Sequence, residues 1–146
     1  MSNMVRFQID AHSDACRGCE ACGLACSVWH HGECSLRLAR LLVTKDMARY
    51  EFAIRICQHC DAAACLDACS VGAMGLDDRG VARIDDTACV RCGSCASACQ
   101  HDAIFFNDAA DMYLKCDLCA GRASGPLCVE VCPVAALTLR EIPRHE

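Results

Sequence analysis

The stretch that decides the fold is Cys-Val-Arg-Cys-Gly-Ser-Cys-Ala-Ser-Ala-Cys, which occupies residues 89–99. Three cysteines stand at every third position, and a fourth follows four residues later. The same spacing recurs at residues 16–26, and looser versions of it occur at residues 57–69 and 116–132. The four groups use sixteen of the 17 cysteines and leave out Cys34; they are Cys16, Cys19, Cys22, Cys26, Cys57, Cys60, Cys65, Cys69, Cys89, Cys92, Cys95, Cys99, Cys116, Cys119, Cys128 and Cys132.

The composition leaves little material for an ordinary hydrophobic core. Of the 146 residues 54% are apolar, but this class includes 17 cysteines and many alanines, and aromatic residues make up only 5%. We therefore expect disulfides, zinc or iron–sulfur clusters to hold the fold together. Residues 1–10 show no export signal, so the sequence predicts a cytoplasmic protein, in which disulfides are rare.

Charge and motif content argue against several functions. The formal net charge is −5 and there is no basic run, which argues against nucleic acid as a partner. No apolar stretch approaches the roughly 18 residues of a spanning helix, so direct membrane insertion is not expected. The sequence contains no Ser-His-Asp set, P-loop or dinucleotide-binding glycine motif. We therefore expect a non-catalytic chain.

The cysteine spacing favours [4Fe–4S] clusters over zinc. Three closely spaced cysteines on a tight loop can bind three iron corners of a cubane cluster. The fourth cysteine, expected at the start of a helix, then ligates the other cluster of a pair. Zinc sites instead use paired knuckles separated by a longer interval. Four motifs, the last ending in the typical step Cys132-Pro133, therefore predict four clusters in two pairs, with zinc as the alternative.

Three segments of the chain form an internal repeat, each beginning at the last cysteine of a group. Each segment carries alanine four positions after that cysteine and predicts a short helix, a turn and a strand. The segments are residues 69–76, 99–106 and 132–139. Return strands are expected at residues 81–84 and 112–114, after turn signals rich in Asp, Asn and Gly.

The first cysteine group breaks this repeat, and the break predicts a nested α+β fold. A longer segment follows the first group and suggests two strands within residues 36–56. Groups two and three are neighbours and would form an inner two-cluster unit, residues 51–109. Groups one and four would close around it as an outer two-cluster unit, residues 1–50 plus 110–146.

Over roughly residues 5–142 the chain resembles the four-cluster ferredoxin-like electron-transfer subunits of large redox complexes. These subunits accompany formate and CO dehydrogenases, energy-converting hydrogenases, molybdenum enzymes of the dimethyl-sulfoxide-reductase type and tungsten aldehyde oxidoreductases. The strings that carry the resemblance are Cys57-Gln58-His59-Cys60-Asp61, Lys115-Cys116-Asp117-Leu118-Cys119 and the stretch from Gly125 to Pro133. The resemblance implies two nested units of the bacterial 2[4Fe–4S] ferredoxin type.

The resemblance also implies a cross-ligated set of cysteines for each of the four [4Fe–4S] clusters. One set is Cys16, Cys19, Cys22 and Cys132. Its pair partner is Cys116, Cys119, Cys128 and Cys26. The third set is Cys57, Cys60, Cys65 and Cys99. The fourth set is Cys89, Cys92, Cys95 and Cys69.

A relay of single electrons is the function that the resemblance implies. One partner would be a large catalytic subunit of molybdenum, tungsten or nickel–iron type, and the chain is most similar to small members that serve tungsten or CO-oxidising enzymes. The second partner would be another donor or acceptor, for example a flavoprotein. The alternatives are a free, diffusing polyferredoxin or a subunit of a CO dehydrogenase, hydrogenase or formate dehydrogenase. Copies could also stack into longer cluster wires.

Three residues near the first cysteine group and one within the second group could have a function besides cluster ligation. For His30, His31 and Cys34 the options are an extra metal site, a redox-sensing thiol or a packed loop. His59 could donate a hydrogen bond to a cluster sulfur, although a solvent-facing loop residue is the simpler interpretation.

Three cations lie within or beside the cysteine loops. Arg17, Arg91 and Lys115 could raise the potential of a nearby cluster, because a cation stabilises the reduced, more negative form. Solvated loop charge is the simpler interpretation of all three.

Overall fold

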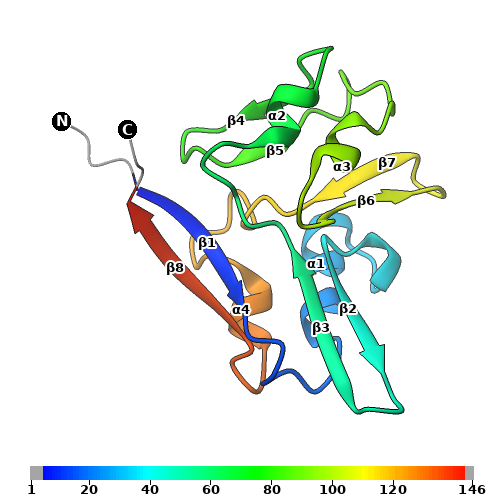
Figure 1. Cartoon of the computed structure of the whole chain (residues 1–146), viewed down its shortest axis with the longest axis vertical. Helices are drawn as coiled ribbons and strands as arrows, with labels where there is room; N and C mark the ends of the chain where they lie inside the picture. The colour runs from blue at the N-terminus through cyan, green and yellow to red at the C-terminus, as the bar shows by residue number, and fades with distance from the viewer. Residues whose placement is uncertain (1–4, 144–146) are drawn as a thin grey trace.

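The computed structural model describes residues 5–143 and contains short elements joined by long loops (Figure 1). In chain order the elements are β1 (Val5–Ala11), α1 (Ala21–His31), the 3₁₀ turn η1 (Leu36–Leu38), β2 (Leu41–Asp46), β3 (Glu51–Ile56), α2 (Ala64–Ala68), β4 (Met74–Leu76), β5 (Ala82–Ile84), α3 (Ser94–Ala98), β6 (Ile104–Asn107), β7 (Met112–Lys115), α4 (Leu127–Val131) and β8 (Leu137–Pro143).

These elements confirm the predicted α+β fold. The described strands form two-stranded antiparallel sheets, in which β2 pairs with β3, β4 with β5, and β6 with β7. The two strands expected within residues 36–56 are β2 and β3, and the expected return strands are β5 and β7. Both predicted unit boundaries, at 50/51 and 109/110, lie in the turns of the β2–β3 and β6–β7 hairpins. The predicted units therefore share hairpins and are not separated by linkers.

The remaining pair, β1 and β8, joins the two ends of the described chain. The strands run antiparallel with Val5 opposite Pro143 and Ala11 opposite Leu137. An ion pair of 2.7 Å between Arg140 Nε and Asp10 Oδ2 links them on the surface. Figure 1 shows this ribbon beside α4.

The short helices end at the fourth cysteine of their groups, which corrects the prediction of a helix beginning there. Each of α2, α3 and α4 contains the third cysteine, and its C-cap is the fourth; the caps are Cys69, Cys99 and Cys132. These caps have extended backbone angles, and a left-handed residue follows three positions later in each case, namely Gly72, Asp102 and Ala135. The extended caps end the helices, and the left-handed residue three positions later turns the chain toward the next strand.

Helix α1 is the exception and explains why the first group breaks the repeat. It runs for 11 residues and contains both Cys22 and Cys26, so the chain continues as helix beyond the fourth cysteine. It ends at Gly32, whose φ of 69° is left-handed and whose N–H donates to the Val28 carbonyl. Among the described residues no helix is both long enough and apolar enough to cross a bilayer.

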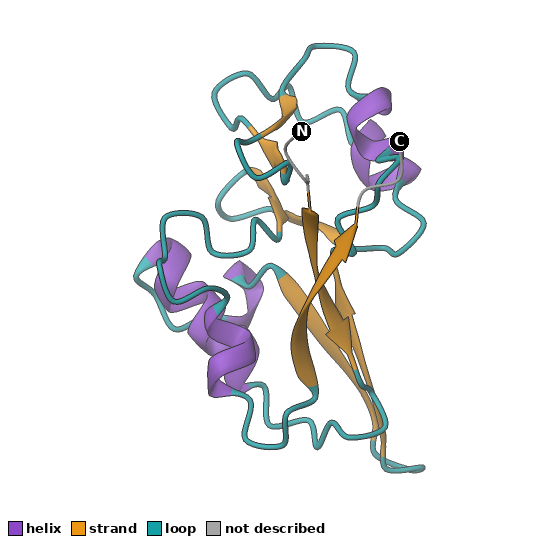
Figure 2. Ribbon diagram, turned by 90° about the vertical axis from the view of Figure 1, so that its left-hand side faces the viewer, coloured by secondary structure: helices purple, strands orange, loops and turns teal. Residues whose placement is uncertain are grey.

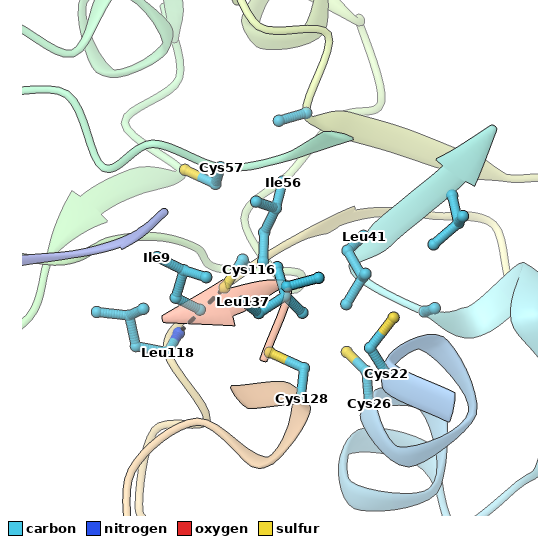
Figure 3. Packing of buried hydrophobic residues seen from close by; sticks show 14 of the residues in the cluster. Ile9, Cys22, Cys26, Leu41, Ile56, Cys57, Cys116, Leu118, Cys128 and Leu137 are labelled. Atoms are coloured by element: carbon cyan, nitrogen blue, oxygen red, sulfur yellow. Dashed lines mark hydrogen bonds between the residues drawn. The ribbon is translucent and has the colours of Figure 1, made fainter. Parts of the chain in front are cut away.

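The helices pack in two pairs, α1 with α4 and α2 with α3. In Figure 2 the two pairs occupy separate ends of the molecule, with the long strands beside one of them. The main core combines aliphatic side chains such as Ile9, Ile56 and Leu137 with buried cysteines (Figure 3). A smaller core around Met74, Ala82 and Ile104 lies between α2 and α3. Cysteine thus occupies interior positions that larger apolar residues fill in most proteins.

Candidate iron–sulfur sites

The four ligand sets that the family resemblance implies remain a prediction, and we call them sites A to D. All 17 cysteines are free thiols and none forms a disulfide. Site A is Cys16, Cys19, Cys22 and Cys132; site B is Cys26, Cys116, Cys119 and Cys128; site C is Cys57, Cys60, Cys65 and Cys99; site D is Cys69, Cys89, Cys92 and Cys95.

Sites C and D surround cavities. The four thiols of site C line a cavity of about 120 Å³, which is bounded also by His59 and Lys115. The four thiols of site D line a smaller cavity of about 20 Å³ beside Met74 and Tyr113. Within residues 5–143, no three His, Cys, Asp or Glu side chains converge as the ligands of one metal ion do. The thiols enclose a space, as ligands of a multi-iron cluster must.

Most thiols of sites A and B lie in the main core. Because charges repel most strongly at short range, the effect of one thiol on the pKa of another indicates which thiols are close. Burial, with repulsion from Cys132, Cys19 and Cys16, raises the pKa of the Cys22 thiol to about 11. Each of these partners belongs to site A, and Cys132 comes from the far end of the sequence.

Site B shows the same effect. Burial, with repulsion from Cys26 and Cys119, raises the pKa of the Cys128 thiol to about 12. Burial also raises the pKa of Cys116, and Cys128 adds to it. Figure 3 shows Cys26, Cys116 and Cys128 among the buried side chains. Thiols buried together in this way ionise only with a cationic partner, which a cluster core supplies.

Backbone N–H groups point at the sulfurs and depend on left-handed residues in the loops. The residue just before the second cysteine of each group has a positive φ; these residues are Gly18, His59, Arg91 and Leu118. For three of them the N–H donates to the sulfur of the first cysteine at 3.4 Å, on Cys16, Cys57 and Cys116. Such bonds stabilise a thiolate and tune the potential of the cluster it holds.

The repeated alanine provides a second group of N–H donors. Four positions after the last cysteine, Ala103 N–H donates to Cys99 Sγ at 3.5 Å, and Ala136 N–H donates to Cys132 Sγ at 3.2 Å. The left-handed residue before each alanine turns this N–H back toward the sulfur. Both alanines are almost fully buried, so a small side chain is what allows the close approach.

A buried ion network adjoins site B. His30 Nε2 lies 2.8 Å from Asp117 Oδ1, and Arg40 Nη1 lies 3.4 Å from Asp117 Oδ2. Burial opposes the charged form of His30, but the hydrogen bond to Asp117 outweighs it and raises the His30 pKa to about 9. Nδ1 of His30 also contacts the Cys26 carbonyl at 2.9 Å, and the Arg40 N–H donates to Cys26 Sγ at 3.3 Å.

The sequence did not predict this contact among His30, Arg40 and Asp117. Asp117 lies inside a quoted motif, but its partner His30 is 87 residues away and only the fold joins them. The proposed extra metal site of His30, His31 and Cys34 does not form, because His30 binds Asp117 and Cys34 is exposed.

Two of the simple interpretations were wrong. His59 is not a solvent-facing loop residue, because it is only 6% exposed, and neither ring nitrogen has a hydrogen-bond partner in the described structure. Lys115 is not a solvated loop charge, because it is only 4% exposed. Arg17 and Arg91 do fit the interpretation better, since their guanidinium groups bond to loop carbonyls and, for Arg91, to Asp86.

Comparison with known proteins gives the class of this chain. The family model for the 4Fe-4S dicluster domain matches residues 48–142. The chain therefore belongs to the 4Fe-4S dicluster family, with a ferredoxin-like fold that carries multiple [4Fe–4S] clusters. The first cysteine group, residues 16–26, lies outside the matched region.

Particular relatives are named as ferredoxin-like or electron-transfer proteins. The uncharacterized ferredoxin-like protein YdhX of Escherichia coli K12 is 32% identical over 142 residues, which cover 91% of this chain and 64% of YdhX. The chain thus spans less than two thirds of that relative. The thiosulfate reductase electron transfer subunit PhsB of Salmonella typhi is 27% identical over 157 residues, which cover 100% of this chain and 82% of PhsB.

A solved structure shares the fold. It is the active site complex BamBC of benzoyl coenzyme A reductase bound to 1,5 dienoyl-CoA. One chain of that complex matches with a TM-score of 0.61 and 26% identity, covering 97% of this chain and 79% of the other.

Proposed function

We propose that this chain is a non-catalytic electron-transfer subunit that relays single electrons through four [4Fe–4S] clusters. The sixteen motif cysteines would be the ligands, one cluster in each of sites A to D. The observation that carries the proposal is that the four thiols of site C line one cavity and the four thiols of site D line another. A bound cluster supplies a one-electron store that changes little in geometry between its oxidation states.

The order of the relay would be A–B–C–D. The charge of Cys22 in site A acts on Cys128 in site B, and the charge of Cys57 in site C acts on Cys116 in site B. Sites C and D share the small core between α2 and α3, which packs against Cys65, Cys69, Cys95 and Cys99. Each site thus adjoins the next.

The same neighbours support the division into an outer unit, residues 1–50 plus 110–146, and an inner unit, residues 51–109. In this proposal α1 and α4 carry the outer pair of clusters, A and B. Helices α2 and α3 carry the inner pair, C and D. The residues of the chain hold the ligands, direct N–H groups at the sulfurs and exclude water from the buried thiols.

For the catalytic partner we propose a tungsten aldehyde oxidoreductase. The support is the resemblance to small subunits of such enzymes and the likeness to a chain of an enzyme active-site complex. The second partner would be a separate redox protein such as a flavoprotein. A reducing compartment, the cytoplasm, suits a chain whose 17 cysteines are all free.

Anaerobic affinity purification of the tagged chain from its own cells tests this proposal. We expect about sixteen iron atoms per chain, from four clusters of four, and EPR signals after reduction with dithionite. We expect a large subunit that contains tungsten to copurify. Nickel or molybdenum in its place would assign another partner, and loss of every large subunit would favour a free polyferredoxin. Iron clearly below the expected number would overturn the four-cluster assignment.

A further inference from the structure

The ammonium group of Lys115 is buried at the end of β7 without a carboxylate partner. Its Nζ donates to the Ala82 carbonyl at 2.6 Å and to the Cys116 carbonyl at 3.1 Å. Both acceptors are neutral, and no ion pair involves Lys115 among the described residues. A buried charge is costly unless an opposite charge lies nearby. We therefore expect an anion to lie close to this cation.

The anion that fits is the cluster of site C. Lys115 lines the cavity that Cys57, Cys60, Cys65 and Cys99 surround. The same ammonium donates to the carbonyl of Cys116, so it also lies beside a proposed ligand of site B. It is thus located where an electron would cross from the outer pair of sites to the inner pair.

We propose that the buried charge of Lys115 raises the reduction potential of the cluster in site C, so that a transferred electron rests there. Adding one electron to the cluster adds one negative charge and moves no proton or atom. A cation in a medium of low dielectric constant stabilises that added charge. We expect less effect from Arg17, which is exposed, and from Arg91, whose charge is paired with Asp86. The inference rests on the proposed ligand set of site C.

The test is a redox titration of the whole purified chain, followed by EPR under anaerobic conditions. Lys115→Gln removes the charge and keeps N–H donors for the two carbonyls, whereas Lys115→Arg keeps the charge. Lys45→Gln is the matched control, because Lys45 is the only other lysine and forms a surface ion pair with Glu20 at 2.8 Å. Cys65→Ala identifies which of the transitions belongs to site C.

We expect Lys115→Gln to lower the potential of the site C transition. The ratio of reduced to oxidised cluster at a fixed potential should fall at least tenfold, which is about 59 mV for one electron. Lys115→Arg and Lys45→Gln should leave this transition near its original value.

The remaining outcomes also decide the question. An unchanged transition in fully loaded Lys115→Gln protein would overturn the inference and leave the proposed function intact. If Lys115→Gln loses iron and Lys115→Arg does not, the positive charge is needed for cluster binding, and an unchanged site C transition in the clusters that remain would overturn the inference. Equal loss in both variants would mean that the side chain acts through packing, which overturns it. Wild-type protein without four clusters would instead refute the proposed function.

Discussion

Replacing Gly18 by alanine should destabilise the loop of site A. Gly18 lies between Cys16 and Cys19 with a φ of 68°, and its N–H donates to Cys16 Sγ at 3.4 Å. A Cβ at this position would lie only 2.5 Å from Cε1 of Phe52 and 2.7 Å from Cδ1. The Phe52 ring packs edge-on against Tyr50 at a centroid distance of 5.1 Å, which limits its freedom to move aside.

Gly32 provides a matched control for the size of the effect. Its φ is 69°, and a Cβ there would meet nothing within 4 Å. Left-handed backbone angles cost alanine roughly 1–2 kcal/mol at either position. Overpacking adds about 1–3 kcal/mol at Gly18 alone. Gly18→Ala should therefore be less stable than Gly32→Ala by about 1–3 kcal/mol.

Loss of visible absorbance from the anaerobic holo-protein at a fixed urea concentration measures this difference. The overlap between the new Cβ and the Phe52 ring should be relieved in the transition state for unfolding. The Gly18→Ala protein should then lose its clusters about 5- to 150-fold faster than the Gly32→Ala protein. Iron analysis before the experiment checks that both variants start fully loaded. Equal rates for the two variants would refute the reasoning, because they would mean that the aromatic ring yields without cost.

Three further substitutions test the sites. Asp117→Asn leaves His30 and Arg40 without their buried carboxylate, so we expect a loss of about 3–5 kcal/mol in stability, read as a lower midpoint in urea; a shift within experimental error would count against the network. Cys132→Ser should alter the EPR signal of the cluster in site A and spare that of site B, and the reverse pattern would exclude cross-ligation. Cys34→Ser should retain the full iron content, and loss of one cluster would add the seventeenth cysteine to the ligands.

Spacing along the chain was sufficient to predict an iron–sulfur protein, because cluster ligands follow a characteristic spacing. The assignment of each cysteine to a cluster came from the family resemblance and stays a prediction. The strands at 81–84 and 112–114 were also predictable, since turn signals precede them and the repeat places them. The helices were misplaced: the pattern indicates a helix that begins at each fourth cysteine, whereas α2, α3 and α4 end there because Cys69, Cys99 and Cys132 take extended backbone angles.

The electrostatic surroundings of the sites could not be predicted in the same way. Burial of Lys115 depends on β5, whose Ala82 carbonyl accepts its hydrogen bond from 33 residues away. The orientation of His59 depends on β1, where Arg6 donates to the His59 carbonyl at 3.0 Å. Such contacts arise from tertiary packing between segments that share no local pattern.

The pairing of β1 with β8 has a consequence for biogenesis. During synthesis the N-terminal strand emerges first and must wait for almost the whole chain before its partner exists. The proposed ligands of sites C and D all lie within residues 57–99, so they would leave the ribosome before Cys128 and Cys132 do. Site A also needs Cys132 under the proposed ligation, and site B needs Cys128. Cluster insertion would then proceed from the middle of the chain outward, with the two ends closing over the finished interior.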